Sequence, residues 1–360
     1  MKYRIALVAL VAGSLSGLAA AQNGGSYVFT SDDDNIYHLP TGSATANSVA
    51  VFPAASRLLG VSVGPNNRLF VGNGPIPVMQ PVNTNTMVYT VDNWFGGPAS
   101  INALQNGDPI QNPNHHIYHA PYNGLVLVNN PGTQEPLPNR SEGIYHVNAG
   151  TGATTVMHPE ASGSNFPFYN AGGAVTAWQG NADRFFVTAV EGSPTISLGH
   201  PSRASSLHRL DVNPGTLQAT ETLIIDLGNT AQTGLAFPVS RANGIANAGN
   251  ALFLSSYEWS TDTSRIIKVD LTPAGGVAGV SVLLDNLPFI NDIVYNPFNN
   301  RLALGDRSTD PGIWEVNLDG TGLTKILDGG PLPERLAVIP APSALALLGL
   351  GTLVAARRKR

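Results

Sequence analysis

The chain contains no cysteine among its 360 residues. This absence excludes disulfide bonds, thiolate nucleophiles, zinc–thiolate centres and iron–sulfur clusters. The fold must therefore be held together by buried apolar surface, and about 315 residues between the chain ends are ample for a large core. Long helical periodicity is also absent from this part of the chain.

Basic residues are scarce, and many of them lie at the two ends. Six of the 19 lysine and arginine residues lie in the first four and last four positions, whereas all 24 acidic residues lie between these ends. The body of the chain thus carries 13 basic and 24 acidic residues. This balance disfavours nucleic acid as a partner, because phosphate binding requires a basic patch. It favours solubility in an extracellular or periplasmic setting.

The N-terminus has the layout of an export signal. Lys2 and Arg4 precede the apolar run 5–12. The small residues Ala19 to Ala21 form a cleavage site for signal peptidase. We therefore predict a signal peptide over residues 1–21. A permanent membrane helix is disfavoured, because the apolar run is short.

The C-terminus combines a Pro-rich motif, an apolar run and a basic end. The motif is Pro340, Ala341, Pro342 and Ser343, the run covers 344–356, and the end is Arg357, Arg358, Lys359 and Arg360. A helix over the run spans roughly 20 Å, which is short of the ~30 Å hydrocarbon core of a membrane. The segment is suited to a weak, temporary anchor. The basic residues would stay cytoplasmic, so that the rest of the chain faces outward.

This layout resembles the PEP-CTERM sorting tail, with Ala341 where that family has Glu. The resemblance implies that residues 339–360 form a hydrophobic helical sorting tail with transient inner-membrane contact. It also implies processing by an exosortase-type membrane protease, which leaves the protein extracellular or at the cell surface. The alternative is an ordinary single-pass C-terminal anchor.

Short β-branched and aromatic runs between clusters of Gly, Pro and Asn predict an all-β body. One such run recurs at intervals of 47 to 63 residues. Its copies begin at Ile36, Val88, Ile144, Leu207, Ile266 and Ile313. A second recurring element is a strand followed by an Asn-rich turn and another strand, as around Pro65 and Pro297. Four strands in each repeat fit the blades of a β-propeller.

The two elements together predict six blades over residues 22–338. Residues 27–30 read as a second strand with no first strand before it, and residues 336–339 are a spare strand at the other end. We therefore expect the C-terminal strand to complete the first blade and close the ring. A pair of β-sandwiches with coincidental spacing is the alternative.

The repeat pattern resembles the six-bladed propellers of the NHL and gluconolactonase-like superfamily. That resemblance implies a divalent cation in the channel, held by a Glu, an Asn and an Asp, for which Glu334, Asn243 and Asp292 match in type and order. Oxygen ligands of mixed charge suit Ca²⁺, which could polarise a lactone carbonyl. Ala242 replaces the proline of the family's motif, and Asn291-Asp292 departs from its Asp-Gly pattern. The alternative is that these polar residues only shape strand entries.

Two further polar clusters are interpreted as structural. On a strand, His115 and His119 would lie roughly 13 Å apart and could not bind one metal, while His116 would point the other way. We interpret all three as residues at a loop entry. The run from Asp32 to Asn35 could bind Ca²⁺, but the same hairpin position holds turn residues in other repeats, so we interpret the run as a turn.

The motifs of common hydrolases and nucleotide enzymes are absent after the predicted signal peptide. The sequence therefore favours an exported, surface-sorted propeller that acts as a cell-surface or extracellular-matrix-associated binding protein, with an extracellular polysaccharide or protein as its ligand and no identified catalysis. The alternative is a Ca²⁺-dependent lactonase-like hydrolase with its metal in the channel.

Overall fold

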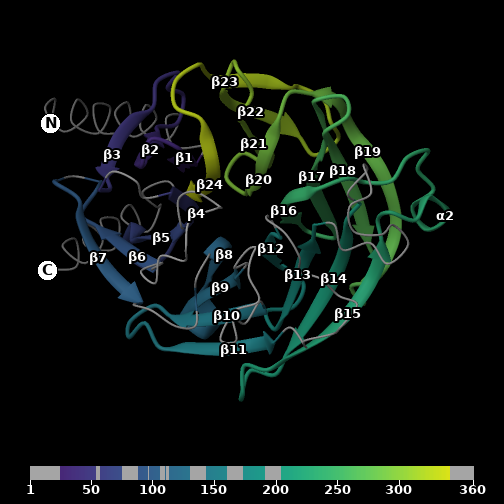
Figure 1. Ribbon diagram of the computed structural model, residues 1–360, viewed down its shortest axis with the longest axis horizontal. Helices are drawn as coiled ribbons and strands as arrows, with labels where there is room; N and C mark the ends of the chain where they lie inside the picture. The colour runs from purple at the N-terminus through teal and green to yellow at the C-terminus, as the bar shows by residue number, and fades with distance from the viewer. Residues whose placement is uncertain are drawn as a thin grey trace, which may run out of the picture.

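The computed structural model describes residues 25–53, 57–74, 88–95, 97–105, 110, 113–129, 143–159, 173–190 and 204–340. These residues form six four-stranded antiparallel sheets arranged as blades around a central axis (Figure 1). The predicted all-β, six-bladed propeller is confirmed. The predicted signal peptide and the predicted hydrophobic helix of the tail lie outside the described residues.

Each blade consists of four strands, ordered from the axis outward. The first blade contains β24 (Pro333–Ile339), β1 (Ser26–Ser31), β2 (Asn35–Leu39) and β3 (Asn47–Val51), and the second contains β4 (Arg57–Val63), β5 (Leu69–Gly74), β6 (Val88–Asp92) and β7 (Ser100–Gln105). The third contains β8 (Pro113–His119), β9 (Gly124–Asn129), β10 (Gly143–Asn148) and β11 (Thr154–Pro159), and the fourth contains β12 (Val175–Ala177), β13 (Arg184–Ala189), β14 (Ser206–Val212) and β15 (Ala219–Asp226). The fifth contains β16 (Ala242–Ala248), β17 (Ala251–Glu258), β18 (Thr263–Leu271) and β19 (Val277–Leu287), and the sixth contains β20 (Ile290–Asn296), β21 (Arg301–Asp306), β22 (Gly312–Asn317) and β23 (Thr324–Asp328).

Helical segments in the described part of the chain are short. They are η1 (Pro65–Asn67), η2 (Ala120–Tyr122) and α2 (Thr230–Thr233). Within the described ranges, no helix has the length and apolar character needed to cross a membrane.

The C-terminal strand β24 closes the ring, as predicted. It pairs with β1, so that Tyr27 lies opposite Val338 and Phe29 lies opposite Leu336. This pairing covers the inner edge of β1, which would otherwise be an unpaired edge. β24 continues through Ile339, which is fully buried, and the chain reaches the surface at Pro340.

Asparagines shape the turns that leave the innermost strands. Asn66, Asn67, Asn123 and Asn300 all adopt left-handed backbone conformations, with φ values of 57°, 58°, 46° and 57°. Asparagine tolerates this conformation better than most residues. The Asn-rich turns of the sequence therefore mark the reversals from β4, β8 and β20 into the second strands of their blades.

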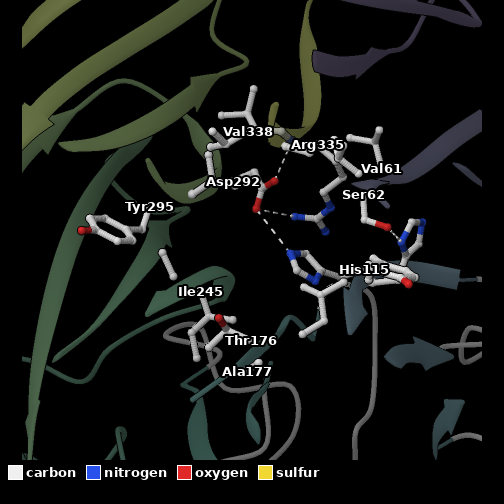
Figure 2. Close-up of a pocket in the computed structure, with 18 of the residues that line it drawn as sticks. Val61, Ser62, His115, Thr176, Ala177, Ile245, Asp292, Tyr295, Arg335 and Val338 are labelled. Atoms are coloured by element: carbon white, nitrogen blue, oxygen red, sulfur yellow. Dashed lines mark hydrogen bonds and ion pairs between the residues drawn. The ribbon is translucent and has the colours of Figure 1, made fainter. Parts of the chain in front are cut away.

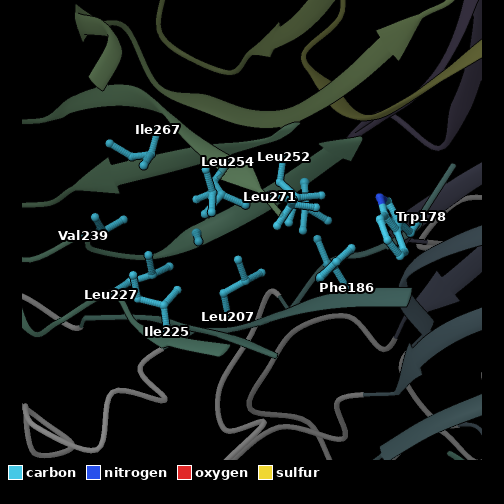
Figure 3. Close-up of a cluster of buried hydrophobic side chains, with 14 residues drawn as sticks. Trp178, Phe186, Leu207, Ile225, Leu227, Val239, Leu252, Leu254, Ile267 and Leu271 are labelled. Carbon is cyan, nitrogen blue, oxygen red and sulfur yellow. The ribbon is translucent and has the colours of Figure 1, made fainter. Parts of the chain in front are cut away.

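The core lies between neighbouring blades, where the two faces of each sheet pack. Between the fourth and fifth blades, Phe186 and Leu207 face Leu252 and Leu254, and all four side chains are fully buried (Figure 3). Burying apolar side chains of this size contributes roughly 1.5–3 kcal/mol each. The other pairs of neighbouring blades bury apolar side chains against each other in the same way.

Candidate functional site

A cavity of about 370 Å³ lies in the channel between the six innermost strands. Its walls are mainly apolar, and its polar groups gather where Asp292, Arg335 and His115 meet (Figure 2). Each of the six innermost strands contributes to the lining, which includes Val61 and Ser62 from β4, His116 from β8, Thr176 from β12, Ile245 from β16, Val294 from β20 and Val338 from β24.

A β-bulge recurs near the start of the innermost strands. In β20, Ile290 pairs with Asp306 and Asp292 pairs with Gly305, so that Asn291 has no partner in the ladder. The residues skipped in the same way are Leu59 in β4, Asn114 in β8, Asn243 in β16 and Glu334 in β24. A bulge removes a residue from the ladder and redirects its backbone groups. Several carbonyl groups near the axis therefore need donors from outside their own sheets.

Arg335, the residue after the bulge in β24, supplies several of these donors. Its Nε donates to the carbonyl oxygen of Leu59 at 3.2 Å. Its Nη1 donates to the carbonyl oxygens of Asn243 at 3.1 Å and Asn291 at 3.2 Å. The guanidinium is buried, with only 5% of the residue exposed. Its planar set of donors suits a ring of acceptors that converge from different strands.

Asp292 provides the negative charge beside this guanidinium. Its Oδ2 accepts a hydrogen bond of 2.8 Å from the backbone N–H of Leu336. Its Oδ1 lies 3.6 Å from Arg335 Nη1 and 3.7 Å from His115 Nε2. Among the described residues, Oδ1 has no partner within hydrogen-bond distance. A buried carboxylate oxygen therefore lines the cavity with unused capacity to accept a hydrogen bond.

Gly244 allows this carboxylate to sit where it does. A Cβ at Gly244 would lie 2.9 Å from Asp292 Oδ1 and 2.8 Å from the backbone nitrogen of Ile293. Both distances are too short for a real side chain, so the close approach requires glycine.

His115 extends the network to the remaining blades. The backbone N–H of Val175 in β12 donates to His115 Nδ1 at 3.3 Å. This bond places the ring proton on Nε2, which faces Asp292. Arg335, His115, Asp292 and the groups that contact them thus come from all six blades, and they form a polar hub on the axis.

The charges in the hub nearly balance. Burial alone would raise the pKa of Asp292, but His115, Arg335 and the N–H of Leu336 outweigh it and lower that pKa. Burial lowers the pKa of His115 more than the carboxylate of Asp292 raises it. At neutral pH the hub therefore contains an ionised carboxylate, a guanidinium and a neutral imidazole.

A serine–histidine pair also lines the cavity. Ser62 Oγ and His116 Nδ1 are 2.9 Å apart. Burial lowers the pKa of His116 to about 3, which makes the imidazole a poor acceptor for the serine proton. The ring also packs against Gly60, where a Cβ would lie 2.6 Å from His116 Cδ2. The pair is therefore better explained as a hydrogen bond that joins the second and third blades.

The three predicted metal ligands lie on innermost strands, but their contacts differ. Asp292 faces Arg335 and His115, whereas Glu334 Oε1 is paired with Arg307 Nη2 at 2.7 Å. Asn243 contributes its carbonyl oxygen to Arg335. Each carboxylate thus faces a cationic side chain of the protein, which does not fit an ion held between them. Within the described ranges, no group of three or more His, Asp or Glu residues is arranged to hold a metal. Calcium binding at these residues stays a prediction.

The interpretation of the three histidines as loop-entry residues was wrong. His115, His116 and His119 all belong to β8, which begins at Pro113. The strand contains a bulge after Pro113, which shifts its register by one residue. His119 packs edge-on against Tyr122 and Phe185, with ring centroids 4.7 and 4.8 Å apart. His115 and His116 instead line the cavity.

The acidic run near the N-terminus forms a turn. Asp33 Oδ1 accepts from the backbone N–H of Asn35 at 3.2 Å, and Oδ2 accepts from the Tyr37 hydroxyl at 2.6 Å. Asp34 adopts a left-handed conformation with φ of 64°. These contacts are those of a tight hairpin turn.

Arg335 and His115 are the site residues that sequence reasoning missed. Their common feature becomes visible only in the structure, because each immediately follows the residue skipped by a bulge, as Asp292 does. Residues at equivalent positions of different blades lie at the same level of the axis.

Comparison with known proteins supports the fold. No family model matches the chain, and no curated protein matches its sequence. A solved structure from Bacteroides fragilis, provisionally assigned as a 6-phosphogluconolactonase, is similar with a TM-score of 0.54 and 12% identity, over 88% of this chain and 98% of the other. The periplasmic gluconolactonase of Pseudomonas aeruginosa is similar with a TM-score of 0.53 and 10% identity, over 88% and 99%.

The fold is also similar to part of a protein with a different chemistry. The tricorn protease aligns with a TM-score of 0.50 and 12% identity, over 86% of this chain and 26% of that chain. At these identities the likenesses show a shared propeller fold, which hosts many chemistries.

Proposed function

We propose that the channel cavity binds small lactones and hydrolyses them, and that the protein does so after export. The observation that carries this proposal is the Oδ1 atom of Asp292, a buried, ionised acceptor that lines the cavity without a hydrogen bond among the described residues. A water molecule or a ligand hydroxyl would satisfy it.

The hub provides the charges that lactone hydrolysis requires. A water held at Asp292 Oδ1 gives a proton to the carboxylate as its oxygen bonds to the lactone carbonyl carbon. The carbonyl then re-forms as the bond between this carbon and the ring oxygen breaks, and the ring oxygen takes the proton back from Asp292 to become the hydroxyl of a hydroxy acid. The positive charge of Arg335 stabilises the negative charge that develops on the carbonyl oxygen. The lowered pKa makes Asp292 a weak base, which restricts the reaction to reactive esters such as lactones.

The lining of the cavity favours an unphosphorylated substrate. Of the described residues that line it, Arg335 is the one arginine and none is a lysine. Three N–H groups of Arg335 already donate to backbone carbonyls. A phosphate group would add roughly two negative charges to a site whose one guanidinium already donates to backbone carbonyl oxygens. The apolar walls instead suit a compact ring with few charged groups.

The similar gluconolactonase structures support the same reaction class through the fold alone.

A purely binding role is the second candidate. It is favoured by the commitment of Arg335 to carbonyl oxygens, which gives that residue a structural role independent of catalysis. Its ligand would be an extracellular polysaccharide or protein.

A lactone panel distinguishes these candidates. The acid released at constant pH measures how fast the mature protein hydrolyses phosphorylated and unphosphorylated lactones. We expect rates above the spontaneous reaction for unphosphorylated lactones. If every lactone in the panel is hydrolysed only at its spontaneous rate and the protein binds an extracellular polysaccharide, the binding role is supported.

The chain ends support export and sorting as part of the same proposal. The predicted exosortase-type processing would fall between Pro340 and Ser343, outside the closing strand. Because β24 ends at Ile339 and Pro340 is exposed, a cut there leaves the ring intact. Mass spectrometry of the protein recovered from a native host tests this step. A C-terminus upstream of Leu336 would contradict it.

A further inference from the structure

Backbone oxygens converge on the channel axis in a pattern that suits a cation. The carbonyl oxygens of Leu59, Asn243 and Asn291 belong to residues that β-bulges have displaced from their ladders. The carboxylate of Asp292 lies beside them. Several neutral oxygens with one negative charge form the type of ligand set that hard cations prefer.

A cation of the protein already contacts this set. Arg335 donates to all three carbonyl oxygens, at 3.1 to 3.2 Å, and its Nη1 is 3.6 Å from Asp292 Oδ1. The three carbonyl oxygens come from the second, fifth and sixth blades, and Arg335 comes from the first. The guanidinium therefore makes the contacts that an ion bound at the axis would make.

The second carboxylate near the axis is also neutralised. Arg307 pairs with Glu334 Oε1, and the amide of Asn291 donates to the backbone oxygen of Glu334 at 2.7 Å. A divalent ion between Glu334 and Asp292 would lie close to two fixed guanidinium groups. Repulsion between like charges is strong in a buried site, because little water screens it.

We infer that the guanidinium of Arg335 is the resident cation of the channel, and that it excludes a divalent metal from Asp292 and the carbonyl oxygens around it. The site then binds the electron-rich carbonyl group of its ligand through a fixed organic cation. The exclusion of metal is independent of the proposed function, whereas the identity of the ligand rests on that function.

Metal titration of the purified, full-length protein tests the inference. Calcium binding is measured by calorimetry, and the thermal unfolding midpoint is compared in calcium and in EDTA. We expect the wild-type protein to bind no calcium with a dissociation constant below about 1 mM, the weak limit of extracellular calcium sites. We also expect the same midpoint under both conditions. One equivalent of tightly bound calcium that is lost in Asp292→Asn would overturn the inference.

Two variants sharpen this test. Arg335→Ala exposes the oxygens to an ion, and we expect it to bind calcium at least tenfold more tightly than wild type. Arg335→Lys keeps a positive charge at the axis and should not gain this binding. Folded Arg335→Ala that gains no affinity would count against the inference. If Arg335→Ala does not fold, the wild-type titration alone decides the question.

The outcomes separate the inference from the proposed function. Absence of both metal binding and lactone hydrolysis would remove the proposed function and leave the inference standing. Hydrolysis that depends on a tightly bound metal would overturn the inference and leave lactone hydrolysis as the function.

Discussion

Asp292 Oδ1 lies 3.6 Å from Arg335 Nη1 on the axis of the propeller, although the two residues are 43 positions apart in the chain. They belong to neighbouring innermost strands, and each follows a residue that a β-bulge displaces. The bulges thus place both the charged pair and the carbonyl oxygens that surround it. Fold and candidate site consequently depend on the same backbone irregularity.

Replacing Arg335 should destabilise the protein strongly. Arg335→Met leaves three buried carbonyl oxygens without their donor and Asp292 without its neighbouring cation. We expect a loss of about 3–5 kcal/mol in the free energy of unfolding, measured by urea denaturation. Arg68→Met is the matched control, because Arg68 is paired with Asp92 at the surface and should cost less than about 1 kcal/mol. Equal losses in the two variants would show that the hub has no special role.

The close approach at Gly244 can be tested with one added carbon. In Gly244→Ala, the new Cβ would clash with Asp292 Oδ1 and the backbone of Ile293. We expect a loss of about 1–3 kcal/mol in unfolding free energy. Gly279→Ala is the control, because a Cβ there meets nothing within 4 Å, and its effect should stay within about 0.5 kcal/mol. Wild-type stability of Gly244→Ala would mean that Asp292 can move without cost.

The stability of the protein should fall as the pH is lowered through the acid range. Burial lowers the pKa of His116 to about 3 in the folded protein, whereas an unfolded chain binds this proton near pH 6.5. The unfolded state therefore binds more protons between these values, so that stability is full above about pH 7 and falls as the pH decreases. His116 should contribute a loss of about 2.5 kcal/mol between pH 7 and about pH 4.5.

His116→Gln tests this contribution. Its unfolding free energy, measured across the same pH range, should fall less steeply than that of the wild type. Burial also lowers the pKa values of His38, His119 and His146, so that part of the slope remains. If the unfolding free energy of His116→Gln depends on pH as steeply as that of the wild type, the acid sensitivity does not come from proton uptake by His116.

Ring closure predicts different effects for two truncations. Ending the chain after Pro340 keeps all of β24 and should leave the thermal midpoint unchanged. Ending it after Leu332 removes the strand that pairs with β1, including the buried Leu336 and Ile339, and should abolish cooperative unfolding. Calorimetry of both proteins compares them directly. A stable protein that ends at Leu332 would show that the first blade does not need its innermost strand.

The architecture was predictable because its signals are local. Each repeat carries its own strands and Asn-rich turn, so the number of blades follows from counting, and the spare strand before Pro340 follows from the missing strand before Tyr27. Such signals do not require knowledge of which residues meet in space.

The site was less predictable because a bulge shifts side chains by one position. The sequence pointed to Asp292 and Glu334 as metal ligands, but it did not identify Arg335, whose guanidinium lies beside Asp292. Arg335 reaches the axis because Glu334 is the displaced residue in β24. A one-residue shift reverses which side chains face inward, and nothing in the residue pattern marks where it occurs.

The most direct test of the account compares lactone hydrolysis by wild-type protein and Asp292→Asn, with Asp285→Asn as the control. Asp285 pairs with Arg265 at the surface, so its loss should not affect the cavity. With equal thermal midpoints established and EDTA present, we predict that kcat/KM falls at least about 100-fold in Asp292→Asn, as expected for loss of a general base, and is unchanged in Asp285→Asn. Equal hydrolysis by wild type and Asp292→Asn would contradict the assignment of the channel cavity as the active site.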